Sequence, residues 1–230
     1  MMKKLICFFF LSIPMLCFAQ IEENTSVVSS NYLEDQIYLG LHYNLLGDKP
    51  NAVFQRNFSY GLQLGLIRDI PLTTNGRVAL GIGLGYAVNS YYSNIISTKA
   101  NGMISYQFAE DDFDYNRSKF QTHSLELPLE FRWRNATRNR YKFFRMYSGL
   151  KFNYNFSNLS KLVTDAGKTS FSNSDIEKFQ YGLMLNVGYN TFNLHLYYAL
   201  SDFMKDNTVL DTGESLSLKP LRIGLIFYLL

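Results

Sequence analysis

The chain is built mainly of segments in which apolar or aromatic residues alternate with small or polar ones. In residues 78–88 the even positions are Val, Leu, Ile, Leu, Tyr and Val, whereas the odd positions hold only glycine and alanine. A period of two is typical of β-strands whose two faces lie in different environments. Eight segments follow this pattern, at residues 37–45, 58–66, 78–88, 125–133, 144–154, 179–189, 192–200 and 221–229. The pattern predicts an all-β fold, and the even number of strands fits a closed antiparallel up-and-down barrel.

The two faces of these segments differ sharply in chemistry. On the apolar face, Ser148 is the only residue that is neither apolar nor aromatic. The opposite face carries ten of the 15 glycines and six charged residues, which are Glu126, Glu130, Arg132, Arg145, Lys151 and Arg222. Glycine weakens a solvated strand, whereas inside a narrow barrel it leaves room for larger side chains. The pattern therefore favours a transmembrane barrel with its apolar face toward lipid over a soluble all-β domain.

The connections between the segments alternate in length. Long ones occupy residues 46–57, 89–124, 155–178 and 201–220, and short ones lie at 71–77, 135–137 and 190–191. Short periplasmic turns and long external loops are the rule in outer-membrane barrels. This orientation predicts two aromatic belts at the membrane interfaces. The outer belt would hold Tyr43, Tyr60, Tyr86, Tyr154, Tyr181 and Tyr198, and the inner belt Trp133, Phe144, Tyr189, Phe192 and Phe227.

The beginning of the chain has the features of an export signal. Lys3 and Lys4 precede an apolar stretch, and Cys17-Phe18-Ala19 ends it with a small-x-small pattern, which predicts cleavage after Ala19. We expect residues 1–19 to be a signal peptide, 20–35 a periplasmic lead and 36–230 the outer-membrane barrel. Cleavage would remove both cysteines, so we expect no disulfide, thiolate metal site or cysteine nucleophile in the mature chain.

Composition excludes several other classes. Charged residues make up 18% and aromatic residues 16% of the chain, which is too aromatic and too poorly charged for a disordered protein. Removing Lys3 and Lys4 takes Lys+Arg from 22 to 20 against 19 Asp+Glu, a balance of +1. A balance this small argues against nucleic acid as a partner. Beyond the N-terminal stretch, no apolar run reaches the roughly 20 residues of a helical membrane span.

The six charged residues on the inner face are the candidate site. Most of them lie on two segments joined by a short turn, so acids and bases are expected to pair across strands, because an unpaired buried charge is costly. The alternative is a ring of charges that lines a pore and selects ions. Side chains about fill an eight-stranded lumen, which favours the plugged network over the pore.

Histidines and acidic residues suggest two further sites, neither of which is favoured. His42 and His195 are expected to face inward. His123 lies at the outer end of its segment, where a Ser-His arrangement could be drawn with Ser124 or Ser90. Neighbours along a strand point to opposite faces, so His123 and Ser124 cannot pair directly, and we expect no enzymatic activity. The cluster at residues 110–114 has carboxylates of the kind that bind calcium. It lacks the spacing of a calcium motif, so a solvated loop is favoured, with no metal and no cofactor.

One hairpin carries a family resemblance. The runs LELPLEF at 125–131, YKFF at 141–144 and YSG at 147–149 resemble the PorT-type outer-membrane β-barrel family. The resemblance implies an outer-membrane barrel of Gram-negative bacteria with a structural or interaction role, and an accessory role in type IX protein secretion. Outer-membrane lipid and proteins bound through the external loops or the barrel wall are the expected partners. A small or gated pore and a lipid-modifying enzyme remain as alternatives.

Overall fold

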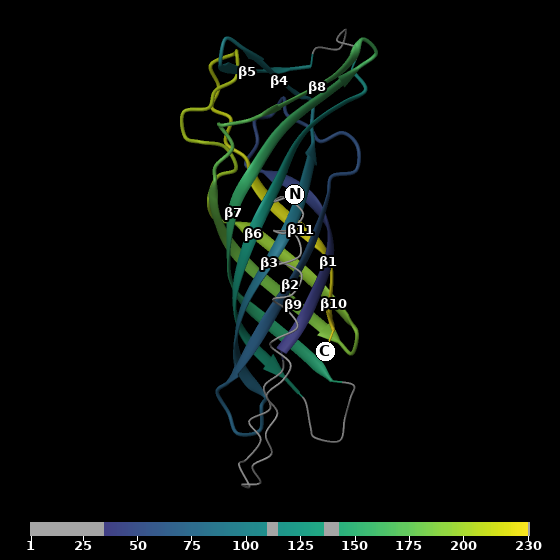
Figure 1. Cartoon of the computed structure of the whole chain (residues 1–230), viewed down its shortest axis with the longest axis vertical. Helices are drawn as coiled ribbons and strands as arrows, with labels where there is room; N and C mark the ends of the chain where they lie inside the picture. The colour runs from purple at the N-terminus through teal and green to yellow at the C-terminus, as the bar shows by residue number, and fades with distance from the viewer. Residues whose placement is uncertain (1–34, 110–114, 136–142, 230) are drawn as a thin grey trace, which may run out of the picture. The chain divides into compact units, whose positions relative to one another are not determined.

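The computed structural model describes residues 35–109, 115–135 and 143–229 (Figure 1). The predicted signal peptide and nearly all of the periplasmic lead therefore lie outside the described residues, as does the acidic cluster at 110–114. No helix in the described ranges is long and apolar enough to cross a membrane.

Every regular secondary-structure element of the described residues is a β-strand. Their bounds are β1 (Asp35–Gly47), β2 (Tyr60–Pro71), β3 (Val78–Tyr92), β4 (Ile95–Ala100), β5 (Met103–Phe108), β6 (Arg117–Arg134), β7 (Phe144–Thr164), β8 (Gly167–Ser172), β9 (Phe179–Tyr189), β10 (Phe192–Ala199) and β11 (Lys219–Leu229). Eight of these pair side by side in the order β1-β2-β3-β6-β7-β9-β10-β11, and β11 returns to β1. All pairings in the ring are antiparallel, so the predicted closed eight-stranded barrel is confirmed.

The assignment of the two faces is also confirmed. On β3 the side chains of Leu80, Ile82 and Leu84 are 41%, 48% and 61% exposed, whereas Ala79 and Ala87 on the other face are fully buried. The same alternation continues around the ring, which leaves a continuous apolar band on the outside of the barrel. A band of this size is far larger than soluble proteins expose, so it is the surface that meets lipid.

The strand register places the predicted aromatic belts at two levels. Toward the long connections, Tyr43 lies directly opposite Tyr60. Toward the short turns, Tyr189 lies opposite both Phe144 and Phe192. The ring centroids of Trp133 and Phe144 are 6.0 Å apart. Aromatic side chains therefore gather at both edges of the apolar band, where a bilayer has its interfaces.

Two strands are much longer than the sequence predicted. β6 has 18 residues and β7 has 21, whereas a tilted strand crosses a membrane in about 9–11 residues. The register between them shifts at His123/Ser124, and beyond that bulge the outward positions of β6 are polar. We therefore place the membrane-crossing parts at 125–133 of β6 and 144–154 of β7, with the remainder outside the membrane.

The connections expected to be loops contain further strands. β4 and β5 form a separate hairpin within the second long connection, and β8 pairs with Leu159–Thr164 at the outer end of β7. Figure 1 shows β4, β5 and β8 gathered at the end of the barrel opposite the short turns. The alternation rule missed them because lipid imposes that pattern only within the membrane. Smaller corrections are that Phe58 precedes β2 and that β10 ends at Ala199.

The face assignment predicts opposite causes of failure at neighbouring positions of β3. Leu84→Arg would place a charge against hydrocarbon and should cost about 2–4 kcal/mol of unfolding free energy near the midplane. Gly83→Ala should destabilise the barrel by crowding instead, because a Cβ there would lie 2.7 Å from the Leu66 carbonyl oxygen and 2.8 Å from Pro128. Urea unfolding in lipid vesicles measures both changes. Normal stability of Leu84→Arg would contradict the lipid-facing assignment.

Candidate functional site

A cluster of charges lies inside the barrel toward the short turns. Arg132 on β6 is fully buried, and its Nε donates to Glu130 Oε2 at 2.9 Å. One terminal nitrogen of Arg132 pairs with Asp69 on β2, and the other donates to Gln36 Oε1 on β1 at 3.0 Å. Arg134 Nη2 pairs with the second Asp69 oxygen at 2.7 Å. Asp69 thus bridges two arginines, and the cluster links β1, β2 and β6.

A second cluster lies nearer the middle of the barrel. Glu126 on β6 accepts from Lys151 Nζ at 3.3 Å and from Arg222 Nη1 at 3.4 Å. Lys151 also donates to Gln63 Oε1 at 2.6 Å, and Arg222 Nε lies 3.3 Å from the Tyr91 hydroxyl. The charged side chains of this cluster are all at least 97% buried, so each depends on these partners in place of water.

The second cluster connects opposite walls of the barrel. In the strand ring, β6 and β11 are four strands apart in both directions, so the pair between Glu126 and Arg222 spans the lumen. The bond from Lys151 on β7 to Gln63 on β2 also joins strands that are not neighbours. Such contacts need space, and Gly40 provides some, because a Cβ there would lie 2.6 Å from Gln63 Cγ.

The structure divides the six predicted charges. Glu130 and Arg132 belong to the first cluster, and Glu126, Lys151 and Arg222 to the second. Arg145 joins neither cluster. Its Nη2 donates to the Asn190 carbonyl oxygen at 2.9 Å, and its guanidinium lies 4.5 Å from the Phe143 ring centroid.

Asp69 and Arg134 were missed by the sequence analysis. Arg68 faces outward and Ile67 inward on β2, which interrupts the alternation and made the predicted segment end at residue 66. Arg134 lies one residue beyond the predicted segment of β6. A signal was nevertheless available, because the predicted set contained four cations and only two acids. That imbalance implies a further inward-facing carboxylate.

Pro128 also lies on the inner face of β6 and is buried. The pairing of β3 with β6 runs on both sides of it, from Ile82 opposite Leu129 to Gly85 opposite Glu126, with no pair recorded between. A proline cannot donate a ladder hydrogen bond, so this gap is where the strand tolerates it. The close approach of Gly83 and Pro128 fits the same gap.

The histidines occupy two separate places. His42 and His195 lie inside the barrel with ring centroids 6.0 Å apart, hydrogen bonded to Asn89 at 2.9 Å and Asn186 at 2.5 Å. His123 is on the outer wall, where its Nδ1 lies 2.6 Å from the Tyr86 hydroxyl.

Neither serine considered for catalysis forms part of a histidine site. Within the described ranges, no hydrogen bond joins Ser90 or Ser124 to a histidine, because Ser90 Oγ accepts from Lys119 and Ser124 Oγ has no partner. Those ranges also contain no group of three or more His, Cys, Asp or Glu residues placed to hold a metal ion.

The four long connections together form what we call the external cap, and they share one apolar core. Its buried members are Leu46, Val53, Tyr91, Ile95, Tyr106, Phe120, Ile176, Phe203, Met204, Leu210, Leu216 and Leu218. Residues from every long connection contribute, and aromatic rings pack closely within it, with Tyr91 and Phe203 centroids 4.9 Å apart. The external connections are therefore packed against one another through a core of their own.

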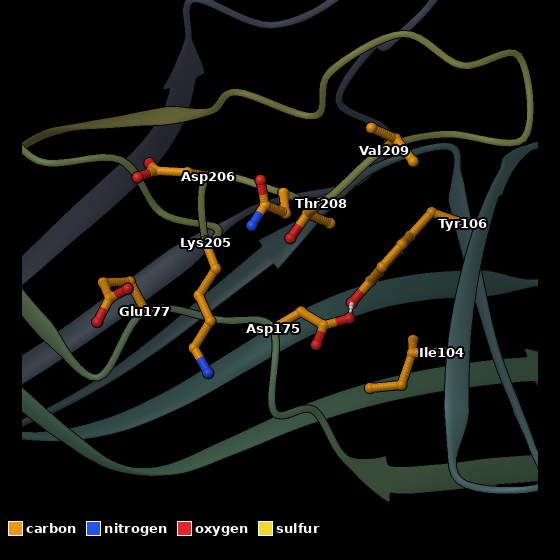
Figure 2. A pocket seen from close by; sticks show the side chains of 9 residues that line it. Ile104, Tyr106, Asp175, Glu177, Lys205, Asp206, Thr208 and Val209 are labelled. Carbon is orange, nitrogen blue, oxygen red and sulfur yellow. Dashed lines mark hydrogen bonds between the residues drawn. The ribbon is translucent and has the colours of Figure 1, made fainter.

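A pocket of 480 Å³ opens on the external cap (Figure 2). It is lined by Ile104 and Tyr106 of β5, by Asp175 and Glu177, and by residues 205–209. The buried Tyr106 hydroxyl lies 3.0 Å from each of two acceptors, Asn173 Oδ1 and Asp175 Oδ2. Burial raises the pKa of the Tyr106 hydroxyl above its ordinary value, at which the group is already neutral at physiological pH.

Comparison with known proteins gives a family and two distant structural likenesses. The family model described as outer membrane protein beta-barrel domain matches residues 18–205. No curated protein matches the chain. The attachment invasion locus protein Ail of Yersinia pestis is 13% identical, with a TM-score of 0.35 over 85% of this chain and 97% of Ail. A mutant Rhodopseudomonas blastica porin is 9% identical, with a TM-score of 0.15 over 86% of this chain and 100% of the porin.

The ion pairs predict that the stability of the barrel depends more on the negative charge of the side chain at position 130 than on its shape. Glu130→Gln would leave Arg132 with one carboxylate in place of two and should cost about 3–5 kcal/mol of unfolding free energy. Glu130→Asp keeps the charge and should cost less. Unfolding followed by heat-modifiability in detergent compares them, and Glu214→Gln, at an exposed glutamate, is the matched control. Equal midpoints for Glu130→Gln and the control would contradict the prediction that buried Arg132 depends on the charge of Glu130.

Proposed function

The chain belongs to the outer membrane protein beta-barrel domain family. From that premise we propose that it is an integral outer-membrane protein with a filled lumen, exported by its N-terminal signal peptide, with a structural or interaction role. Its external cap is the surface that meets protein partners. In this proposal the barrel serves as an anchor and conducts neither ions nor solutes.

The observation that carries the proposal is the ion pair between Glu126 and Arg222. The two residues come from strands on opposite sides of the ring, and their side chains meet at 3.4 Å. Lys151 and Gln63 meet at the same cluster from two further strands. A water-filled pore would keep its charges apart and solvated, as a selectivity ring requires. Direct contact between side chains from opposite walls favours the plug.

The external cap adds a second obstruction. Its apolar core draws on all four long connections and includes inward-facing residues at the outer ends of β1, β3 and β6. Apolar side chains packed across a mouth exclude water and ions. A packed set of connections also offers partners a surface of fixed shape, which lowers the ordering cost of binding.

The same geometry supports a non-enzymatic role. His42 and His195 are buried and bound to amide side chains, and among the described residues neither has a nucleophile or a carboxylate as hydrogen-bond partner. Catalysis of acyl transfer needs a nucleophile, a base and an orienting group within hydrogen-bond reach. A lipid-modifying enzyme is therefore the less favoured alternative.

An accessory role in type IX secretion is the finer form of the proposal. It rests on the resemblance of the LELPLEF strand to PorT-type barrels, and that strand supplies Glu126 and Glu130, one to each charge cluster. Deleting the chain should then lower secretion of type IX cargo proteins into the medium. Unchanged secretion would remove this role and leave the interaction role to be defined by co-purification from native outer membranes.

The filled lumen predicts that the protein does not conduct ions across planar bilayers. Purified, heat-modifiable barrel inserted into the bilayer should give no steady step in conductance, because ion pairs and the external cap occupy the path. A Glu126→Gln variant should be equally silent, since the loss of one charge leaves the packing in place. Steady conductance whose cation preference changes in Glu126→Gln would instead establish the charges as the ring of a pore.

A further inference from the structure

Four cations lie on one face of the outer wall, beyond the membrane-crossing parts of the strands. We call Arg117, Lys119, Lys161 and Lys168 the basic wall patch. Lys119 of β6 is directly opposite Lys161 of β7, and Val163 of β7 is opposite both Arg117 of β6 and Lys168 of β8. Directly opposed residues share a face of the sheet, so the four cations project from the same side.

The side from which they project is the lipid-facing side of the barrel. Odd-numbered residues of β6 face outward along its whole length, from Trp133 and Leu125 in the membrane to Lys119 and Arg117 beyond it. The bulge at His123/Ser124 places the extra residue on β7, so this order is kept on β6. The patch therefore continues the apolar wall directly outward.

No acid of the described ranges forms an ion pair with the patch. The lysines instead have neutral acceptors, since Lys161 Nζ donates to Gln121 Oε1 at 2.9 Å and Lys119 Nζ to Ser90 Oγ at 3.4 Å. Asp165, in the turn between β7 and β8, accepts from Asn116 at 2.9 Å. Desolvation first, and then the charges of Lys119 and Lys168, lower the pKa of Lys161. Like charges directly opposite each other destabilise a strand pair, so an anion at this place would relieve the strain.

Lys119 and Lys161, the pair of the patch nearest the membrane, lie just beyond the height of the lipid headgroups. His123 packs at the edge of the apolar band, with its ring centroid 6.1 Å from that of Tyr86 and 6.4 Å from that of Phe156. Four residues at about 3.4 Å each, on a strand tilted by about 40°, place Lys119 roughly 10 Å farther out. A headgroup layer is about 5–8 Å thick on each side of the hydrocarbon, and long lysine side chains can reach back toward it.

We propose that the basic wall patch binds the phosphate groups of phosphorylated glycolipids in the outer leaflet. Lysine binds phosphate as a point charge, and several lysines and an arginine on one face suit a headgroup with more than one phosphate. The lipid-side position selects a membrane lipid over a soluble partner, which would approach the external cap instead. This inference depends on the outer-membrane location but not on the filled lumen, so conductance in planar bilayers leaves it intact.

The test measures unfolding midpoints of the full chain with two lipids. The variant is Lys119→Gln with Lys161→Gln, and the matched control is Lys99→Gln with Lys205→Gln, which removes the same charge from the external cap. In neutral detergent the variant should unfold at or above the midpoint of the parent, because opposed like charges are removed. This arm also shows that the variant folds.

Adding lipid A to the detergent should then reverse the order. A ligand that binds only the folded state raises its midpoint, so the parent and the control should gain and the variant should gain much less. Binding of lipid A to the variant should weaken by tenfold or more, with recovery in Lys119→Arg with Lys161→Arg. Dephosphorylated lipid A should give no difference between parent and variant.

Three results would overturn the proposal. One is an equal gain from lipid A in variant and parent, and another is an equal effect of dephosphorylated lipid. The third is a shift by inorganic phosphate as large as that by lipid A at the same concentration, which would assign the patch to a soluble anion.

Discussion

Charges enclosed by an eight-stranded barrel have to neutralise one another, because the wall separates them from water and an unpaired buried ion costs several kcal/mol. This constraint explains why Asp69 bridges Arg132 and Arg134, and why Glu126 is shared by Lys151 and Arg222. It also explains glycines such as Gly81 on the neighbouring strand β3, where a Cβ would lie 2.8 Å from Arg132 Cδ and take the room that the arginine side chain needs. The sizes and the charges of the inward-facing side chains therefore depend on each other.

The ion pairs contribute more to fixing the register of the strands than to the net free energy of unfolding. Replacing a buried ion pair with well-packed apolar groups is often neutral or stabilising, so stability alone does not account for the clusters. A one-residue slip of β6, however, would turn Glu126 and Glu130 toward lipid and bring Leu125 and Leu127 inside. Both errors are costly, and the charges on β6 thus penalise the wrong pairing strongly. Pro128 lies between the two glutamates, at the break within the ladder that pairs β6 with β3.

Within the membrane, most of the architecture could be predicted from the sequence. Lipid outside and a narrow interior impose strict alternation, which located all eight membrane strands and five of the charges that form ion pairs. The prediction failed where that constraint ends. Arg68, an outward charge at the inner edge of the membrane, interrupted the alternation before Asp69, and β4, β5 and β8 lie outside the membrane, where no lipid imposes alternation. The apolar core of the external cap was also missed, because its members are scattered over four connections without a period.

The plugged lumen depends most on contact between opposite walls, and a double-mutant cycle on Glu126 and Arg222 measures that contact. Glu126→Gln, Arg222→Gln and the double variant would be unfolded with urea in the same lipid vesicles, and Lys151, present in all four proteins, cancels from the comparison. Residues in contact couple by about 0.5–3 kcal/mol, whereas distant residues are additive within about 0.3–0.5 kcal/mol. We predict that the double variant loses less stability than the sum of the single variants, by an amount in the coupled range. Additive losses would mean that the two side chains do not meet and that the lumen between them is open to water.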